Sequence, residues 1–364
     1  MRRVLRLVAL MALVAALGGV LVLAPSRPAR AQAAPTDFVL PTDVWAVYRS
    51  HFIDQSGRVV DTGNGGISHS EGQGYGLLLA LLANDRATFE QIWTFTLTEL
   101  LIRDDGLAAW KWDPNATPHI TDINNATDGD ILIAWALAQA GERWNSAAYL
   151  DAARRIARAI ATVTLRRDGD RVVLLPGATG FSAADRPDGP ILNLSYWVFE
   201  ALPVLARLAP GHDWNGLTRT GLALVGSARF GTVQLPTDWI SVPSGRPPEP
   251  AEGFDPVFGY NSLRIPLYLL GAGHAERQRL EPFLRSWTAN GGRPAIVDVT
   301  TGRVLEVLGE RGYRMQTALL ACALDGTAIP DDLKQFQPTS YYASTLHLLA
   351  MTVVARRYPR CLAG

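Results

Sequence analysis

Residues 65–82 read GGISHSEGQGYGLLLALL, a glycine-rich polar turn that runs directly into an apolar helix. Glycine inside a helix costs about 1 kcal/mol relative to alanine, so the glycines at 72, 74 and 76 are poor choices for its first turns. We interpret them as positions where the backbone must come close to a neighbour or where space is left for a ligand ring.

Glu71 stands at the entrance of this helix, four residues before the aromatic Tyr75. An apolar pocket disfavours the charged form of a carboxyl, so Glu71 is a candidate general acid. The alternative is that its charge merely complements the helix N-terminus. This segment alone leaves both interpretations open.

Residues 124–137, NNATDGDILIAWAL, repeat the arrangement of a polar, acid-bearing turn followed by an apolar helix. We expect Thr127 or Asp128 to be the N-cap of that helix. Two acids, two asparagines and a threonine exceed what capping requires. A pair of acids in different environments is the minimum equipment for hydrolysis of a glycosidic bond.

Hydrophobic periodicity predicts a mainly helical chain. The expected helices come in pairs and lie near residues 41–52, 73–84, 86–103, 129–141, 146–163, 190–208, 214–228, 262–271, 275–290, 311–325, 331–336 and 340–357. A strand is expected at 171–175 and a hairpin at 295–299 and 304–308. No low-complexity linker divides the chain, which favours one domain. A closed ring of helical hairpins accommodates a dozen helices, although periodicity does not distinguish it from a solenoid or an irregular bundle.

The N-terminus has the features of a signal peptide. Three arginines, Arg2, Arg3 and Arg6, precede an apolar run over 7–24, and small residues around 29–33 provide cleavage sites. The alternative is an uncleaved anchor, since the run is near the spanning minimum of roughly 17 residues. We therefore predict a signal peptide at 1–31, a single catalytic domain at 32–364, and a periplasmic or secreted protein.

The charge balance argues against nucleic acid or an anionic membrane as partner. The chain has 34 basic and 34 acidic residues, and five of the basic ones lie within the first 30, so the mature part has 29 basic against 34 acidic residues. Both kinds of partner favour clusters of Lys and Arg.

Two cysteines, Cys322 and Cys361, leave the redox question open. Cys322 lies in an apolar run and fits a small buried hydrophobe, whereas an oxidising compartment permits a disulfide with Cys361. No Cys/His cluster has metal-ligand spacing, so we predict neither a structural zinc ion nor a cofactor.

Seven segments, in order, resemble glycoside hydrolase family 8, and within it the cellulases associated with bacterial cellulose synthesis. They occupy residues 70–76, 110–112, 126–130, 193–197, 235–239, 258–268 and 341–342. The resemblance extends from about Trp45 to Tyr358. It implies an all-α protein, an (α/α)6 barrel of six helical hairpins with a few short β-hairpins in its loops. It also implies hydrolysis with inversion of the anomeric centre.

By this resemblance Glu71 matches the general acid of the family. Asp128 matches the second acid of its signature, which lies near the reacting sugar and helps to distort it or to steer the attacking water. The working carboxyls of an inverting enzyme lie about 6.5–9.5 Å apart, which leaves room for that water.

One position departs from the family pattern. Many relatives have an aspartate after the tyrosine of the Phe-Gly-Tyr segment, where it serves as general base, but this chain has Asn261. An amide orients water but cannot accept its proton. Three interpretations follow. Asp128 is the general base, or Asp255 or Glu252 is the general base, or the protein is slow or inactive. Arg264 is expected to pair with the carboxylate at this place.

Sugar rings present apolar C–H faces, so aromatic planes along a groove form subsites while amides bind the hydroxyls. The candidates for binding substrate are Tyr75, Trp110, Trp112, Asn125, Tyr196, Trp239, Tyr260, Asn261, Arg264 and Tyr341.

The sequence therefore predicts an endo-acting β-1,4-glucan hydrolase that works as a monomer and assists the export or trimming of cellulose beside a cellulose synthase complex. The alternatives are hydrolysis of another β-1,4 polymer, such as chitosan or xylan, and a catalytically impaired glucan-binding component.

Overall fold

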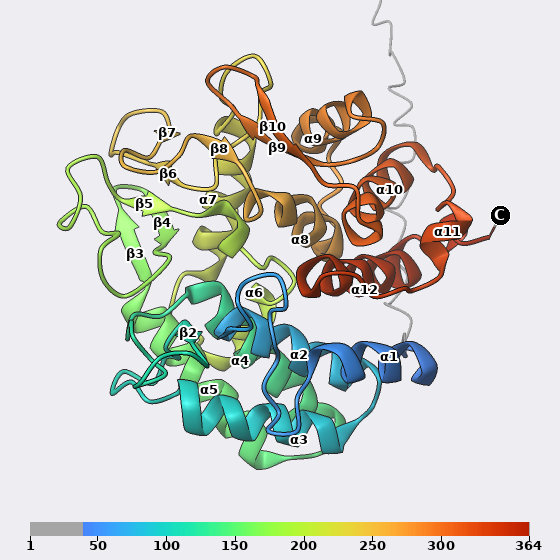
Figure 1. Ribbon diagram of the computed structural model, residues 1–364. Coiled ribbons are helices and arrows are strands. Elements are labelled where there is room, and N and C mark those ends of the chain that lie inside the picture. Colours follow the sequence, from blue (N-terminus) through green and yellow to red (C-terminus); the bar gives the residue numbers. More distant parts are fainter. Residues whose placement is uncertain (1–38, 364) are drawn as a thin grey trace, which may run out of the picture. The chain divides into compact units, whose positions relative to one another are not determined.

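Twelve α-helices lie within residues 39–363, the part of the chain that this computed structural model describes, and they alternate along the chain between an outer and an inner layer (Figure 1). The outer helices are α1 (Thr42–Phe52), α3 (Arg86–Phe95), α5 (Ala147–Val163), α7 (Trp214–Ser227), α9 (Arg277–Ala289) and α11 (Asp331–Lys334). The inner helices are α2 (Ser70–Leu82), α4 (Thr127–Arg143), α6 (Leu202–Leu208), α8 (Ile265–Ala272), α10 (Arg311–Asp325) and α12 (Tyr341–Arg357).

The sequence explains which layer each helix joins. In α5, buried residues recur at three- and four-residue spacing from Tyr149 to Ala161, which is the pattern of a helix with one apolar face. In α8 every residue from Ile265 to Gly271 is buried, so that helix is enclosed on all sides. Inner helices contact each other from α2 to α4 to α6 and from α8 to α10 to α12, and α12 returns to α2. Between α6 and α8, the 3₁₀ turn Leu194–Tyr196 before α6 contacts α8. This closed ring is the (α/α)6 barrel that the family resemblance implied, and the solenoid and the irregular bundle are excluded.

The strands are short and lie in the connections. They are β1 (Ser68–His69), β2 (Lys111–Trp112), β3 (Leu165–Asp168), β4 (Arg171–Leu174), β5 (Ile191–Leu192), β6 (Ile240–Ser241), β7 (Glu249–Pro250), β8 (Val257–Phe258), β9 (Ala295–Asp298) and β10 (Val304–Val307). The predicted hairpin is confirmed, because β9 and β10 pair antiparallel. The predicted strand near 171–175 is β4, which pairs with β3.

The helix predicted over 190–208 is wrong in its first half. Only α6 is α-helical there, and the preceding residues form β5 and a 3₁₀ turn, Leu194–Tyr196. The side chain of Asn193 accepts a hydrogen bond from the Ser195 backbone N–H at 3.1 Å, and Pro203 stands in the first turn of α6. These two residues place the start of the α-helix at Leu202, six residues after Tyr196 of the 3₁₀ turn. The helix predicted over 86–103 is likewise shorter, since α3 is followed by a π-helical turn, Thr96–Leu100.

A disulfide joins Cys322 in α10 to Cys361 in the 3₁₀ turn that follows α12. Cys322 is also fully buried. The bond therefore ties the C-terminal turn to an inner helix of the barrel.

The described residues all belong to one compact unit, Pro35–Gly364. The predicted signal peptide lies outside the described residues. Over 39–363, no helix combines the length and the apolar character that crossing a bilayer requires.

Candidate active site

The N-terminal ends of the inner helices open onto one cavity of about 660 Å³, a volume typical of sites for small-molecule ligands. It is lined by Asp61, Gly63, Asn64, His69, Ser70, Glu71, Trp110, Ala126, Asp128, Tyr196, Trp239, Tyr260, Asn261, Arg264, Glu310, Tyr313, Ser340 and Tyr342. The structure thus brings together eight predicted site residues: both acids, Trp110, Tyr196, Trp239, Tyr260, Asn261 and Arg264.

Glu71 owes its position to the turn that precedes α2. Ser68 and His69 pair with β2, and the Nδ1 atom of His69 accepts a hydrogen bond from the Gly72 backbone N–H at 2.9 Å. His69 is therefore the N-cap of α2, and Glu71 falls in the first turn, facing the cavity. Burial opposes the charged form of His69, but the hydrogen bond to Asp61 and the charges of Glu71 and Asp128 outweigh it and raise the His69 pKa.

The glycines of α2 are explained by packing and not by a ligand. A Cβ at Gly72 would meet the Tyr341 hydroxyl at 2.9 Å, one at Gly74 the Cβ of Leu132 at 2.5 Å, and one at Gly76 the Val59 side chain at 2.6 Å. The interpretation that they leave space for a sugar ring is wrong. The interpretation that the backbone approaches a neighbour closely is confirmed.

Asp128 lies in the first turn of α4, 1% exposed. The predicted capping role is wrong, because the N-cap is Ala126 and no side chain caps this end. Thr127 instead donates to the Leu175 carbonyl at 2.8 Å. Burial raises the pKa of Asp128 to about 7, the nearby Arg264 opposes this shift, and Glu71 adds to it.

Arg264 binds both acids. Its Nη1 atom forms ion pairs with Glu71 and, at 3.1 Å, with Asp128. Its Nη2 atom donates to Ser195 at 2.9 Å and to the Asn261 side-chain oxygen at 3.0 Å. The guanidinium is 1% exposed. Burial lowers its pKa, but the charge of Glu71 and the surrounding tyrosines outweigh burial and raise the Arg264 pKa. Two acids distant in sequence therefore converge on one buried cation.

Asn261 is held between Asp238 and Arg264, and both groups of its side-chain amide take part. Its backbone N–H and side-chain Nδ2 contact the Asp238 carboxylate at 3.4 and 3.5 Å, while its oxygen accepts from Arg264. Asp238 also accepts from the backbone N–H groups of Gly259 and Ser262. Asp238 therefore organises the loop beneath the cavity.

The structure does not place the two proposed substitutes for the base at the site. Glu252 and Asp255 are both exposed, and neither belongs to the cavity lining. The reading in which one of them acts as the base is therefore wrong for this arrangement.

Four predicted binding residues lie outside the lining. Tyr75 and Tyr341 are buried behind it, 0% and 1% exposed. Trp112 packs edge-on against Phe95, with Arg58 over its ring at 4.9 Å. Asn125 is buried and donates to Asp130 at 2.9 Å, which fixes the turn before α4.

The cavity also holds residues that sequence reasoning missed, among them Asp61, Glu310 and Tyr342. The Tyr341-Tyr342 pair pointed to this place, but only one of two adjacent helical residues faces a given side, and it is Tyr342. Asp61 and Glu310 lie in connections without a distinctive local pattern, and only the fold brings them to the site.

The aromatic lining differs from a row of open stacking planes. Trp239 stacks on Phe181, with ring centres 5.5 Å apart, and on Phe254 at 4.9 Å. Tyr260 is 43% exposed and packs against Tyr313 and Tyr342. Tyr260 is therefore the aromatic of this lining with the most surface left for a ligand.

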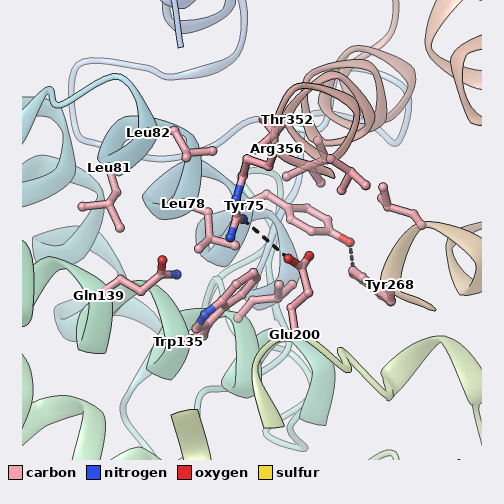
Figure 2. Close-up of a pocket in the computed structure, with 14 residues that line it drawn as sticks. Tyr75, Leu78, Leu81, Leu82, Trp135, Gln139, Glu200, Tyr268, Thr352 and Arg356 are labelled. Carbon is pink, nitrogen blue, oxygen red and sulfur yellow. Dashed lines mark hydrogen bonds and ion pairs between the residues drawn. The ribbon is translucent and has the colours of Figure 1, made fainter. Parts of the chain in front are cut away.

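A second cavity lies deeper in the barrel, behind Tyr75 (Figure 2). Tyr75 meets the Tyr268 hydroxyl there and also accepts from Arg264 at 3.3 Å, while Glu200 pairs with Arg356 at 3.5 Å. Its volume is about 50 Å³, whereas a single water needs roughly 10–15 Å³. It has room for a few waters but is too small for a sugar chain.

Comparisons with known proteins identify the family of this chain. The model of the family "Glycosyl hydrolases family 8" matches residues 24–356. The chain is 41% identical to a probable endoglucanase of Novacetimonas hansenii, covering 93% of this chain and 97% of that protein. It is 35% identical to an endoglucanase of Cellulomonas uda, covering 71% and 72%. The solved endo-beta-1,4-glucanase of Acetobacter xylinum is similar with a TM-score of 0.78 and 37% identity, covering 87% of this chain and 98% of that one. The chain therefore belongs to glycoside hydrolase family 8.

Proposed function

We propose that this protein hydrolyses internal β-1,4 bonds of a glucan such as cellulose, with inversion at the anomeric carbon. The observation that carries the proposal is the convergence of Glu71 and Asp128 on Arg264 in a cavity with aromatic walls. The relatives named above are endoglucanases, which supports the choice of polymer. In this proposal Glu71 protonates the leaving oxygen, and Asp128 orients the acid and the sugar.

The test is hydrolysis of soluble carboxymethyl-cellulose by the purified mature protein beside Glu71→Gln. An endo-acting enzyme lowers the viscosity of the polymer long before many reducing ends form. Loss of a general acid lowers the rate by about 100-fold or more. Equal rates in the two proteins would remove Glu71 from this role. Binding of cello-oligosaccharides without any product would instead support the non-catalytic reading.

Chitosan is the second candidate substrate, because the charge of the cavity favours a cationic polymer. The lining holds four carboxyl groups, those of Asp61, Glu71, Asp128 and Glu310, against the basic side chains of Arg264 and His69. Initial rates on carboxymethyl-cellulose, chitosan and xylan distinguish these cases. A higher kcat/KM for chitosan would reverse the order of the two candidates.

We propose further that the protein acts outside the cytoplasm, in the periplasm or after secretion, as a monomer. The disulfide supports this location, since such bonds persist in oxidising compartments. A role beside a cellulose synthase complex follows only from the sequence resemblance. Fractionation of cells, light scattering and co-purification with the synthase test these three statements separately.

A further inference from the structure

The pair of acids at Arg264 is too close to carry out an inverting displacement alone. Both carboxylates contact the same guanidinium nitrogen at 3.1 Å or less, so the contacting oxygens are separated by less than twice that distance. An inverting acid and base lie about 6.5–9.5 Å apart with a water between them. If the proposed function holds, a third carboxylate must accept the proton of the attacking water.

Within the described residues, the lining offers two further carboxylates, Asp61 and Glu310. Asp61 belongs to the loop that leads into α2, on the side of the cavity that carries Glu71. Its Oδ2 atom lies 3.4 Å from His69, the residue that caps the same helix. Asp61 therefore contacts the turn that carries Glu71 and does not lie opposite Glu71.

Glu310 lies on the other side of the cavity. It directly precedes α10, and in a ring of six inner helices α10 is the position opposite α4, which carries Asp128 (Figure 1). The side chain is half-buried and lines the same cavity. A carboxylate here lines the same cavity as the acid pair but comes from a different part of the ring.

The orientation of Glu310 is fixed by neutral donors. The Ser340 backbone N–H donates to Oε2 at 2.9 Å, and the Ser340 hydroxyl lies 3.0 Å from Oε1 and 2.9 Å from Oε2. Ser340 precedes α12 and also lines the cavity. Lone pairs remain on each oxygen of a carboxylate that accepts so few bonds.

We propose that Glu310 is the general base of the reaction, because the amide of Asn261 cannot accept a proton. Water attacks the anomeric carbon while Glu310 takes one of its protons. The bond from that carbon to the leaving oxygen breaks, and Glu71 gives its proton to that oxygen. The products are an α-configured reducing end and a free hydroxyl. The proton gained by Glu310 and that lost by Glu71 then equilibrate through solvent.

The test compares Glu310→Ala, Asp61→Asn and the surface variant Glu281→Gln on the polymer that the wild type hydrolyses. We expect Glu310→Ala to lower kcat by about 100-fold or more and to keep its affinity for cello-oligosaccharides. Azide needs no base, so adding it should restore bond cleavage in Glu310→Ala and yield an α-glycosyl azide. Glu281 lies on the outer helix α9 in a surface pair with Arg277, and its variant should match the wild type.

A near-normal rate in Glu310→Ala would overturn the proposal, as would azide rescue of Asp61→Asn in place of Glu310→Ala. A merely structural role for Glu310 would give a slow variant that azide does not restore, which would also contradict it. An inactive wild type would instead remove the proposed function itself, and the two failures are thus distinguishable.

Discussion

Arg264 is a buried cation with two acidic neighbours, and the site depends on its charge. Without it, Glu71 and Asp128 would be close together in a place where Asp128 is 1% exposed. Removing one partner of a buried ion pair commonly costs about 3–5 kcal/mol, because the remaining charge has no compensation.

We therefore expect Arg264→Met to lower the free energy of unfolding by about 3–5 kcal/mol and to abolish hydrolysis, as measured by urea denaturation and by release of reducing ends. Adding Asp128→Asn to Arg264→Met removes one of the two uncompensated carboxylates and should recover part of the lost stability. Equal stability of wild type and Arg264→Met would show that the cation contributes nothing to folding.

The first turns of α2 and α4 pack so closely that there is no room for a side chain at Gly129. A Cβ at Gly129 would meet the Ser70 hydroxyl at 2.1 Å and the Glu71 backbone nitrogen at 2.7 Å. The register of the two acids is therefore a property of the helix pair, set by a glycine outside the cavity lining.

Gly129→Ala should push the two helix ends apart and move Glu71 relative to Asp128. A displacement near 1 Å can cost about 100-fold in rate, so we expect a loss of that order in kcat with a lower melting temperature. Gly226 in α7 is the matched control, since nothing lies within 4 Å of a Cβ there. Gly226→Ala should raise stability by about 0.5–1 kcal/mol and leave activity unchanged. Comparable activity of both variants would contradict the packing argument.

The ring of helices closes where α12 returns to α2, and the disulfide acts on this last part of the molecule. Cys322 and Cys361 are 39 residues apart in sequence, and their bond ties the segment after α12 to α10. A cross-link of this kind stabilises a protein by about 2–4 kcal/mol, mainly by restricting the unfolded chain.

We expect Cys361→Ala, or reduction of the wild type, to lower the free energy of unfolding by about 2–4 kcal/mol while kcat at moderate temperature stays the same, because neither cysteine lines the cavity. Denaturation with and without a reductant measures the first effect, and the polymer assay measures the second. A reductant that left the unfolding midpoint unchanged would show that the bond is not formed in solution.

The helical architecture and the two acid-bearing turns can be predicted from the residue pattern alone. Periodicity located ten of the twelve helices closely, because amphipathic and fully apolar helices both bear their burial pattern in the chain. Motif spacing identified Glu71 and Asp128, each in the first turn of an inner helix. It misjudged residues 190–201, where the local hydrogen bond of Asn193 and a following proline override helical periodicity.

Which residues share the cavity depends on how the helices pack in three dimensions. Glu71, Arg264 and Glu310 come from three parts of the chain and line one cavity because the inner helices all begin at one end of the ring. When the ring closes, Tyr75 and Tyr341 are buried in the core, and Asn125 donates a hydrogen bond to Asp130 and does not line the cavity. A local sequence pattern specifies which side chains of a helix are buried. It does not specify which side chains of other helices they contact, because those contacts join segments distant in sequence.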